Sequence, residues 1–202
     1  MTVNEALTRI DGILPMTIAA RDRVSPPPVV SDGVVFAIPD GAQGEWAGQD
    51  GKLAVASNGG WGFVTPQAGW RAFLLPEGVQ AVHDGAGWIS GALTLLPDGA
   101  GMRAGLVDGE QVLSAGSSIV TDITIPEGAM VIGVTARVTA DISGSLQAWR
   151  IGTGAATDRF GSGLGLPAGS WGRGVLGSPM TYYSEEPLVL TAEGGSFSAG
   201  TV

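Results

Sequence analysis

The residues with the clearest potential chemistry are aromatic and charged side chains in the second half of the chain. They are Trp149, Trp171, Tyr182 and Tyr183, together with Asp158 and Arg159. Aromatic rings can stack on the C–H faces of sugars, while carboxylate and guanidinium groups hydrogen-bond to hydroxyls. The pattern therefore predicts a glycan-binding surface. Large aromatic residues also fill protein cores, so a core position is the alternative, above all for Trp149.

Residue patterns typical of enzymes are largely missing. The chain has no cysteine and a single histidine, His83, which we expect on the surface of a strand. Glu185 and Glu186 are adjacent and would face opposite ways on a strand, whereas a retaining glycosidase holds its carboxyl groups about 5–5.5 Å apart. We therefore predict a protein that is not an enzyme and that holds no metal or cofactor. A polysaccharide-degrading activity is the less favoured alternative.

Composition narrows the partners and the architecture. The 34 glycines and 12 prolines indicate many tight turns, and a hydrophobic fraction of 44% argues against disorder. The net charge of −9 argues against nucleic-acid binding, which needs a basic face. No apolar stretch is long enough to cross a bilayer, and the first residues lack a basic signal-peptide region. We expect neither membrane insertion nor a signal peptide.

An internal echo predicts two similar hairpins. Val55–Trp61 and Val82–Trp88 share a residue pattern. Both segments predict a strand, a two-residue glycine turn and a second strand that begins at tryptophan. Asn-Gly and Asp-Gly favour type I′ turns, which need positive φ at both central residues. The echo is typical of a protein built from short hairpins.

The region 1–90 is predicted to form a short N-terminal helix and a small β domain. Thr2–Glu5 fits a capping box, and Val3, Leu7, Ile10 and Leu14 form an apolar stripe that packs on its own domain or on another subunit. A stiff, proline-rich connector follows over Arg21–Ser31. Six short strands then suggest a β-meander barrel or curled sheet. They are expected at Val34–Ile38, Lys52–Ala56, Trp61–Thr65, Trp70–Leu75, Val79–His83 and Gly87–Ser90.

The region 91–202 is predicted to be a jelly-roll-like β-sandwich, which makes the whole chain all-β. Strands are expected at Val120–Ile125, Met130–Ile142, Leu146–Ile151 and Leu188–Ala192. The third should pair back on the second across Ser143-Gly144. The glycine-rich segment Gly152–Ser178 is expected to be a long binding loop, because structureless connections are rarely so long without a role.

Four motifs in the first half resemble an uncharacterised phage-associated domain family. They are Asn4–Asp11, Gly44–Gly48, Asn58–Trp61 and Ala68–Trp70, and the resemblance runs from Val3 to Ser90. Members of this family occur in prophage tail fibres and in the head spikes of gene transfer agents. Asp158–Gly163 and Leu190–Gly195 are similar to the β-rich partner domain of those proteins. The chain stops at Thr201-Val202, where an unpaired edge strand is expected.

The resemblance implies a head-spike fibre of a gene transfer agent, a virion component that adheres to capsular or other cell-surface polysaccharide. It implies synthesis in the bacterial cytoplasm and a place on the surface of a phage-like particle, beside other spike, capsid or tail proteins. The low charge content, the apolar stripe and the expected open edge favour a homo-oligomer, a trimer or a pentamer. A purely structural decoration subunit that binds no glycan is the alternative.

Overall fold

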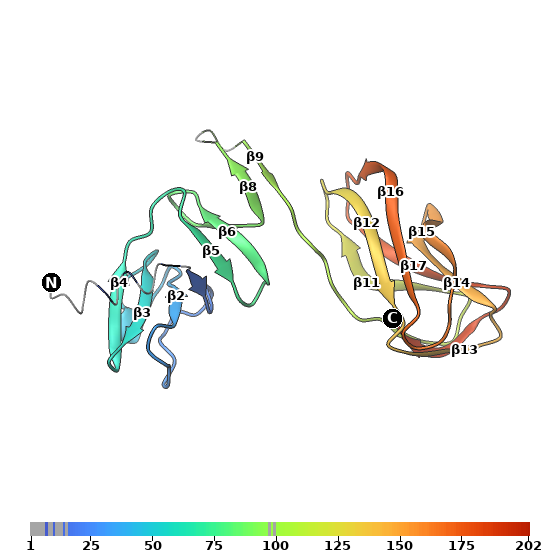
Figure 1. Ribbon diagram of the computed structural model, residues 1–202, viewed down its shortest axis with the longest axis horizontal. Helices are drawn as coiled ribbons and strands as arrows, with labels where there is room; N and C mark the ends of the chain where they lie inside the picture. Colours follow the sequence, from blue (N-terminus) through green and yellow to red (C-terminus); the bar gives the residue numbers. More distant parts are fainter. Residues whose placement is uncertain (1–6, 8–9, 11–13, 15, 97, 99) are drawn as a thin grey trace. The chain divides into compact units, whose positions relative to one another are not determined.

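The computed structural model describes Leu7, Ile10, Leu14, residues 16–96, Asp98 and residues 100–202. The chain divides into two compact units, Met1–Gly105 and Leu106–Val202, each built almost wholly from strands (Figure 1). The all-β class is therefore confirmed. The first unit extends beyond the boundary predicted at residue 90, because the hairpin of β8 (Ala92–Leu95) and β9 (Gly101–Arg103) is bonded to it. The Gly91 N–H donates to the Gln80 carbonyl at 2.7 Å.

No helix of seven or more residues is seen among the described residues, although Leu7 and Ile10, within the expected N-terminal helix, are helical. The expected helix falls mostly on positions outside the described residues, of which Leu7, Ile10 and Leu14 are exceptions. All three are exposed, and the Leu14 N–H donates to the Ile10 carbonyl at 3.0 Å. The helical element that the structure does define is one 3-10 turn, η1 (Gly44–Trp46). No helix in the described part of the chain is long and apolar enough to cross a membrane.

The first unit is a seven-stranded sheet in the order β4-β3-β2-β1-β5-β6-β7. Its strands are β1 (Thr17–Ile18), β2 (Val35–Ala37), β3 (Leu53–Ser57), β4 (Gly60–Val64), β5 (Arg71–Leu74), β6 (Val79–His83) and β7 (Trp88–Ser90). The six predicted strands are confirmed to within one residue at each end. The missed strand, β1, lies at the centre and pairs in parallel with β2 and β5. It joins two antiparallel meanders of three strands each.

Both faces of this sheet carry a core. Leu53 and Val55 of β3 pack on one face with Ile18 and Leu74, while Ala54 packs on the other. Successive strand residues point to opposite faces, so β3 is buried continuously. The second face is dominated by three rings, Phe36, Trp46 and Trp61, whose centroids lie 5.1–5.8 Å apart in tilted or edge-on pairs. Such pairs add to the free energy of burial and fix the position of η1.

The echoed hairpins share their register. Ala56 pairs with Trp61, and His83, at the equivalent place, pairs with Trp88. The first turn is type I′ as predicted, with φ of 52° at Asn58 and 75° at Gly59.

The second turn is not type I′, because Gly85 has a φ of 109° but Ala86 is not in the left-handed region. It is closed instead by the Asp84 carboxylate, which accepts the N–H groups of Ala86 and Gly87 at 2.8 Å each. These hydrogen bonds stabilise the charged form and lower the pKa of Asp84.

His83 is buried, and its expected surface position is wrong. Only 4% of the residue is exposed, and its ring meets Trp88 edge-on at 5.1 Å. Nδ1 accepts the Gly85 N–H at 3.1 Å, so this nitrogen carries no proton. Burial disfavours the imidazolium and lowers the pKa of His83. The histidine is therefore part of the hairpin's packing.

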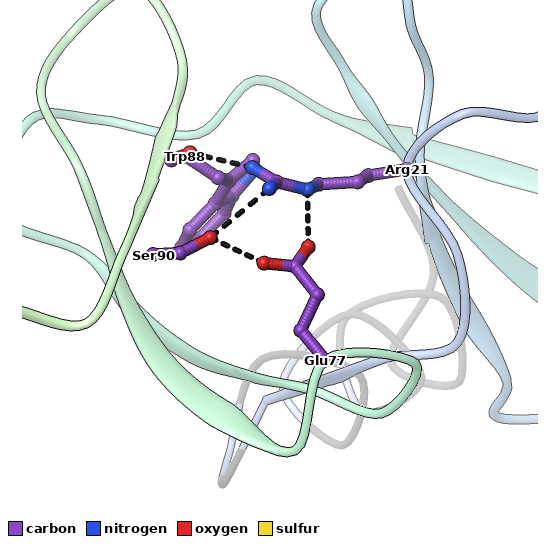
Figure 2. Close-up of polar contacts among 4 residues, drawn as sticks. All are labelled: Arg21, Glu77, Trp88 and Ser90. Atoms are coloured by element: carbon purple, nitrogen blue, oxygen red, sulfur yellow. Dashed lines mark hydrogen bonds and ion pairs between the residues drawn. The ribbon is translucent and has the colours of Figure 1, made fainter. Parts of the chain in front are cut away.

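A second polar contact ties the segment after β1 to the far side of the sheet (Figure 2). The Arg21 guanidinium donates to the Trp88 carbonyl at 2.8 Å and to the Ser90 hydroxyl at 3.0 Å. Its Nε lies 2.6 Å from a carboxylate oxygen of Glu77, and Ser90 donates to the other oxygen of that carboxylate. Arg21 thus joins β7, the β5–β6 turn and the segment that enters the proline-rich connector.

The second unit contains nine strands that surround one hydrophobic core. They are β10 (Val112–Leu113), β11 (Ser118–Ile125), β12 (Met130–Arg137), β13 (Ala140–Gly144), β14 (Ala148–Thr153), β15 (Ala156–Leu164), β16 (Trp171–Thr181), β17 (Glu186–Glu193) and β18 (Phe197–Thr201). One sheet has the order β11-β17-β14-β15. The other has the order β10-β18-β13, and β16 pairs separately with β12.

This order is that of a jelly roll. The predicted long strand over 130–142 is present as β12 and β13, interrupted at Val138 and Thr139; β16 lies along its first half and β18 along its second. The chain then crosses between the two sheets after most strands, which is the jelly-roll connection. The predicted sandwich type is confirmed. The expected pairing of Leu146–Ile151 with the preceding strand is wrong, because β14 belongs to the opposite sheet and pairs with β15 and β17.

The C-terminal strand is not an open edge. Thr201 of β18 pairs with Val112 on one side and with Ala140 on the other. Val202 exchanges two backbone hydrogen bonds with Gln111, at 2.8 and 3.0 Å. The expectation of an unpaired edge at Thr201-Val202 is therefore wrong, and the argument for a homo-oligomer loses that support.

The segment Gly152–Ser178 is not a loop, contrary to prediction, because β15 and most of β16 lie within it. Its glycines permit close backbone contacts. A Cβ on Gly174 would lie 1.9 Å from the Phe160 carbonyl oxygen, and one on Gly152 would lie 2.0 Å from the Ala156 carbonyl oxygen. Glycine inside a strand often marks such an approach of another backbone. The glycine content was misread as turn composition.

Valine substitutions test the two hairpin turns. Gly59→Val and Gly85→Val should each lower the free energy of unfolding by roughly 1–3 kcal/mol, because a β-branched residue is strained at positive φ. Gly87→Val is the matched control. Gly87 lies in the second turn without positive φ and with nothing near its Cβ position, so the change should stay within about 0.5 kcal/mol. Urea denaturation measures all three, and equal effects would contradict the turn geometry.

Alanine substitutions within β16 test the close approach of β15. Gly174→Ala should destabilise the second unit by roughly 2–4 kcal/mol, because the Cβ would collide with the Phe160 carbonyl. Gly177→Ala, in the same strand but with no atom within 4 Å of the added Cβ, should change stability by less than about 0.5 kcal/mol. Differential scanning calorimetry compares the two variants. Equal melting temperatures would show that β15 and β16 are not in contact at Gly174.

Candidate functional site

The six candidate glycan-binding residues do not form one cluster. Trp149, on β14, is fully buried at the centre of the second unit's core, and its Nε1 donates to the Gly165 carbonyl at 2.9 Å. Its ring offers no face to a ligand. Trp149 is therefore a core residue, which was the alternative that the sequence left open.

Tyr182 and Arg159 lie together at the border of that core. Tyr182 is 7% exposed, and its hydroxyl has no hydrogen-bond partner among the described residues. Burial disfavours the phenolate and raises the pKa of Tyr182, while the Arg159 charge and the neighbouring Thr153 hydroxyl act in the opposite direction. Arg159 is half-buried and donates to the Met180 sulfur at 3.0 Å. Asp158, beside it on β15, is exposed.

Trp171 and Tyr183 are exposed but lie far apart. Trp171 is 57% exposed and pairs with Arg137 at one end of the β12–β16 pair. Tyr183 is 85% exposed and follows Thr181, which pairs with Met130 at the other end. The two ends are separated by the length of β12, roughly 23 Å at about 3.3 Å per residue. Only an extended polymer could contact both aromatic rings.

The alternation of β16 places an exposed aromatic ring on an open sheet face. Trp171, Arg173 and Val175 point outward, whereas Gly172 and Gly174 point toward β15. We call the exposed side opposite the core the β12–β16 face. It consists of Ile132, Thr135 and Arg137 from β12 and Trp171, Arg173 and Val175 from β16.

On this face one arginine contacts the Trp171 indole and a second is the cross-strand partner of Trp171. The Arg173 guanidinium carbon lies 4.0 Å from the centroid of the Trp171 ring, a cation–π contact worth about 0.5–1 kcal/mol when exposed. Arg137 is the cross-strand partner of Trp171. Neither arginine forms an ion pair or a hydrogen bond with any side chain in the part of the chain that the structure describes. The arrangement can bind a flat, hydrogen-bond-accepting ligand from solvent.

Trp171 is among the binding residues predicted from the sequence, whereas Arg137 and Arg173 are not. Arg173 follows Trp171 by two residues, so strand alternation would place both on one side of a sheet. That signal was available, but it was lost because the segment was read as a loop. Arg137 is distant in sequence, and only the register of β12 against β16 brings it to Trp171.

Neither β12 nor β16 contains a histidine, a cysteine or a carboxylate side chain. Among the residues that the structure describes, no group of three or more histidine, cysteine, aspartate or glutamate side chains could hold a metal ion. The remaining functional groups of the β12–β16 face are two cations, one hydroxyl and three apolar side chains. They are suited to binding.

Substitutions at Tyr182 separate a core role from a binding role. Tyr182→Phe should leave the free energy of unfolding unchanged or raise it by up to about 1 kcal/mol, because a buried hydroxyl without a partner is removed. Tyr182→Ala should cost roughly 3 kcal/mol, because the ring fills the core. Chemical denaturation measures both variants. A loss of more than about 1 kcal/mol in Tyr182→Phe would instead show a hydrogen bond between Tyr182 and Thr153.

Comparison with known protein families finds a match within the first unit. Residues 3–89 match the model of a family described as "Protein of unknown function (DUF2793)". The match agrees in extent with the resemblance drawn over Val3–Ser90, and it leaves the jelly-roll unit outside. No curated protein matches the chain. The first unit of this chain therefore contains a DUF2793 domain.

Proposed function

We propose that this chain is a non-enzymatic spike or fibre component of a phage-like particle and that it attaches the particle to cell-surface polysaccharide. The first unit assembles with other spike, capsid or tail proteins, and the second unit presents the β12–β16 face to the cell. The observation that carries the proposal is the exposed Trp171 ring with the Arg173 guanidinium over it, on a sheet face that the described part of the chain leaves open. A gene transfer agent head spike is the specific form of particle that we favour.

The surface chemistry supports a binding role. Trp171, Val175 and Ile132 are 57%, 75% and 70% exposed, and exposed apolar side chains gathered in a patch generally mark an interaction site. They stand on two long strands whose inner side chains pack on the core. A rigid sheet keeps a recognition surface in place before the ligand arrives, which lowers the entropic cost of binding.

The fold supports the proposal only by analogy. Jelly rolls are frequent in viral capsid proteins and in lectins, but the same fold carries many unrelated functions. The analogy makes a particle component that binds glycans plausible in architecture. The specific argument for glycans is the Trp171–Arg173 pair.

An open face of this kind binds one sugar chain weakly, and adhesion is proposed to depend on avidity. Several copies of the face in a homo-oligomer, a trimer or a pentamer, would contact the same polysaccharide layer together. Once one copy is bound, the others experience a high effective concentration of ligand, which strengthens attachment without new contacts. This arrangement requires the particle to carry the chain at its surface.

One observation favours the structural alternative. Ile132 and Val175 are 70% and 75% exposed. Apolar side chains that are buried between subunits in an assembly are exposed in this way in the separated subunit. A pure decoration protein would bury the β12–β16 face against a neighbour and bind no glycan. The two functions therefore differ in whether the assembled particle leaves Trp171 accessible.

Removal of the Trp171 ring tests the proposal. Multivalent beads that carry the full chain should bind capsulated cells of the bacterium that encodes it and leave its acapsular mutant unbound. Trp171→Ala should lower binding at least about tenfold, which is about 1.4 kcal/mol and lies within the roughly 1–3 kcal/mol that an aromatic ring contributes by stacking on a nucleic-acid base. Leu106→Ala is the control, since Leu106 is 86% exposed and outside the face.

Both variants should keep the melting temperature of the wild-type chain, since both side chains are exposed. Equal binding of capsulated and acapsular cells, or full binding by Trp171→Ala, would contradict adhesion through this face. The structural subunit would then be the better account.

A further inference from the structure

We infer that the β12–β16 face recognises an anionic polysaccharide, one that carries carboxylate or sulfate groups. The inference rests on the proposed function and specifies its ligand class. It starts from how charge is distributed over the second unit. Leu106–Val202 contains nine acidic residues, four arginines and no lysine, so most of its surface repels anions.

The β12–β16 face departs from that balance. Two of the four arginines, Arg137 and Arg173, lie on it, and neither β12 nor β16 contains an aspartate or a glutamate. Segregation of this kind makes a local positive site in a negative protein. Such a site attracts anionic groups to the neighbourhood of Trp171. Apart from Arg137 and Arg173, β12 and β16 carry no charged side chain.

Arg21 and Arg159, unlike Arg137 and Arg173, form an ion pair or a hydrogen bond with another side chain in the described part of the chain. Arg21 is committed to Glu77 and Ser90 in the first unit, and Arg159 is half-buried against the Met180 sulfur. Arg137 and Arg173 are exposed, and the described part of the chain offers neither one a carboxylate. Their N–H donors therefore remain available to a ligand.

Contact with the indole leaves donors of Arg173 accessible. The Arg173 guanidinium carbon lies over the Trp171 ring, 4.0 Å from its centroid, and Arg173 is exposed, so the N–H groups of its planar guanidinium that do not face the ring can reach a ligand. That planar fork matches the two oxygens of a carboxylate or sulfate. Arg137, opposite Trp171 in the register, offers a second fork on the same face of the sheet. A sugar ring at the indole edge can place an acidic substituent at either arginine.

A neutral glycan fits the same face less well. Sugar hydroxyls both donate and accept hydrogen bonds, whereas arginine only donates. Besides the arginines, the defined face offers the indole N–H of Trp171, which only donates, and the hydroxyl of Thr135, so acceptors for hydroxyl protons are scarce. A face of donors is complementary to groups that only accept, which are ionised carboxylates and sulfates.

The test compares charged and uncharged forms of the same polymer. The full chain on multivalent beads is offered capsular polysaccharide extracted from the encoding bacterium, either native, carboxyl-reduced or desulfated. Native polymer should bind, and binding should fall at least about tenfold when the responsible acidic group is removed. The reduction and desulfation arms show whether the group is a carboxylate or a sulfate. Raised NaCl should weaken binding to the native polymer.

Arginine variants connect the charge to the face. Arg137→Gln and Arg173→Gln should each weaken binding about tenfold, and Arg173→Lys should recover only part of it because lysine lacks the planar fork. Arg71→Gln, an exposed arginine on β5 of the first unit, is the control and should bind as wild type. Unchanged melting temperatures exclude misfolding as the cause.

The outcomes separate this inference from the proposed function. If the polymer binds equally well after carboxyl reduction and desulfation, and Trp171→Ala still abolishes binding, the ligand is neutral and the inference is overturned while adhesion stands. If no form of the polymer binds, the proposed function fails and the inference fails with it. If native polymer binds but both arginine-to-glutamine variants bind as wild type, the acidic group is recognised elsewhere and the inference is overturned.

Discussion

The contact between β15 and β16 is the constraint on which the second unit depends. Gly174 lies so close to the Phe160 carbonyl that no side chain fits between the two strands. The inward positions of β16 must therefore be glycine here, and the side chains of that stretch can only point outward. The same alternation that closes the jelly roll at this side places Trp171, Arg173 and Val175 in solvent. Packing and surface chemistry are two consequences of one sequence pattern.

The first unit is held together by different contacts. Its sheet is buried on both faces, and a two-residue central strand, β1, joins two meanders in parallel. Such a short strand contributes few ladder hydrogen bonds, so the surrounding contacts must hold the meanders together. The Arg21 contacts with Glu77, Trp88 and Ser90 and the three-ring cluster around Trp46 serve this purpose. A unit with a core on both faces of its sheet suits the assembly role proposed for it.

The sequence predicted much of the fold where local chemistry decides structure. Alternating apolar residues between Asn-Gly, Asp-Gly and proline turns located the strands of the first unit, and the long strand over 130–142 indicated a sandwich. Strand β1 was beyond reach, because two residues show no periodicity. The turn at Gly85 is not the type I′ turn that Asp-Gly favours, because the Asp84 carboxylate accepts two of its N–H groups in addition to the backbone hydrogen bond from the Asp84 N–H to the Gly87 carbonyl.

The candidate site was predicted less well, because it depends on register and on which side of a strand faces the core. Trp149 and Tyr182 are aromatic residues like Trp171, yet the packing of two sheets buries the first two and leaves the third in solvent. The glycines of β15 and β16 resemble the composition of a loop. In a single sequence, a glycine that permits close approach of two backbones cannot be distinguished from a glycine that forms a turn. Arg137 reaches Trp171 only through pairing across the strand.

The most direct test of the central claim is fluorine NMR of the full chain labelled with 5-fluorotryptophan, during titration with oligosaccharides of the capsular polysaccharide. The chain has six tryptophans, which single substitutions assign. We predict that the Trp171 resonance shifts with ligand while those of the buried Trp46 and Trp149 stay unchanged. A shift confined to tryptophans of the first unit, or a Trp171 resonance unmoved at saturating ligand, would contradict recognition by the β12–β16 face.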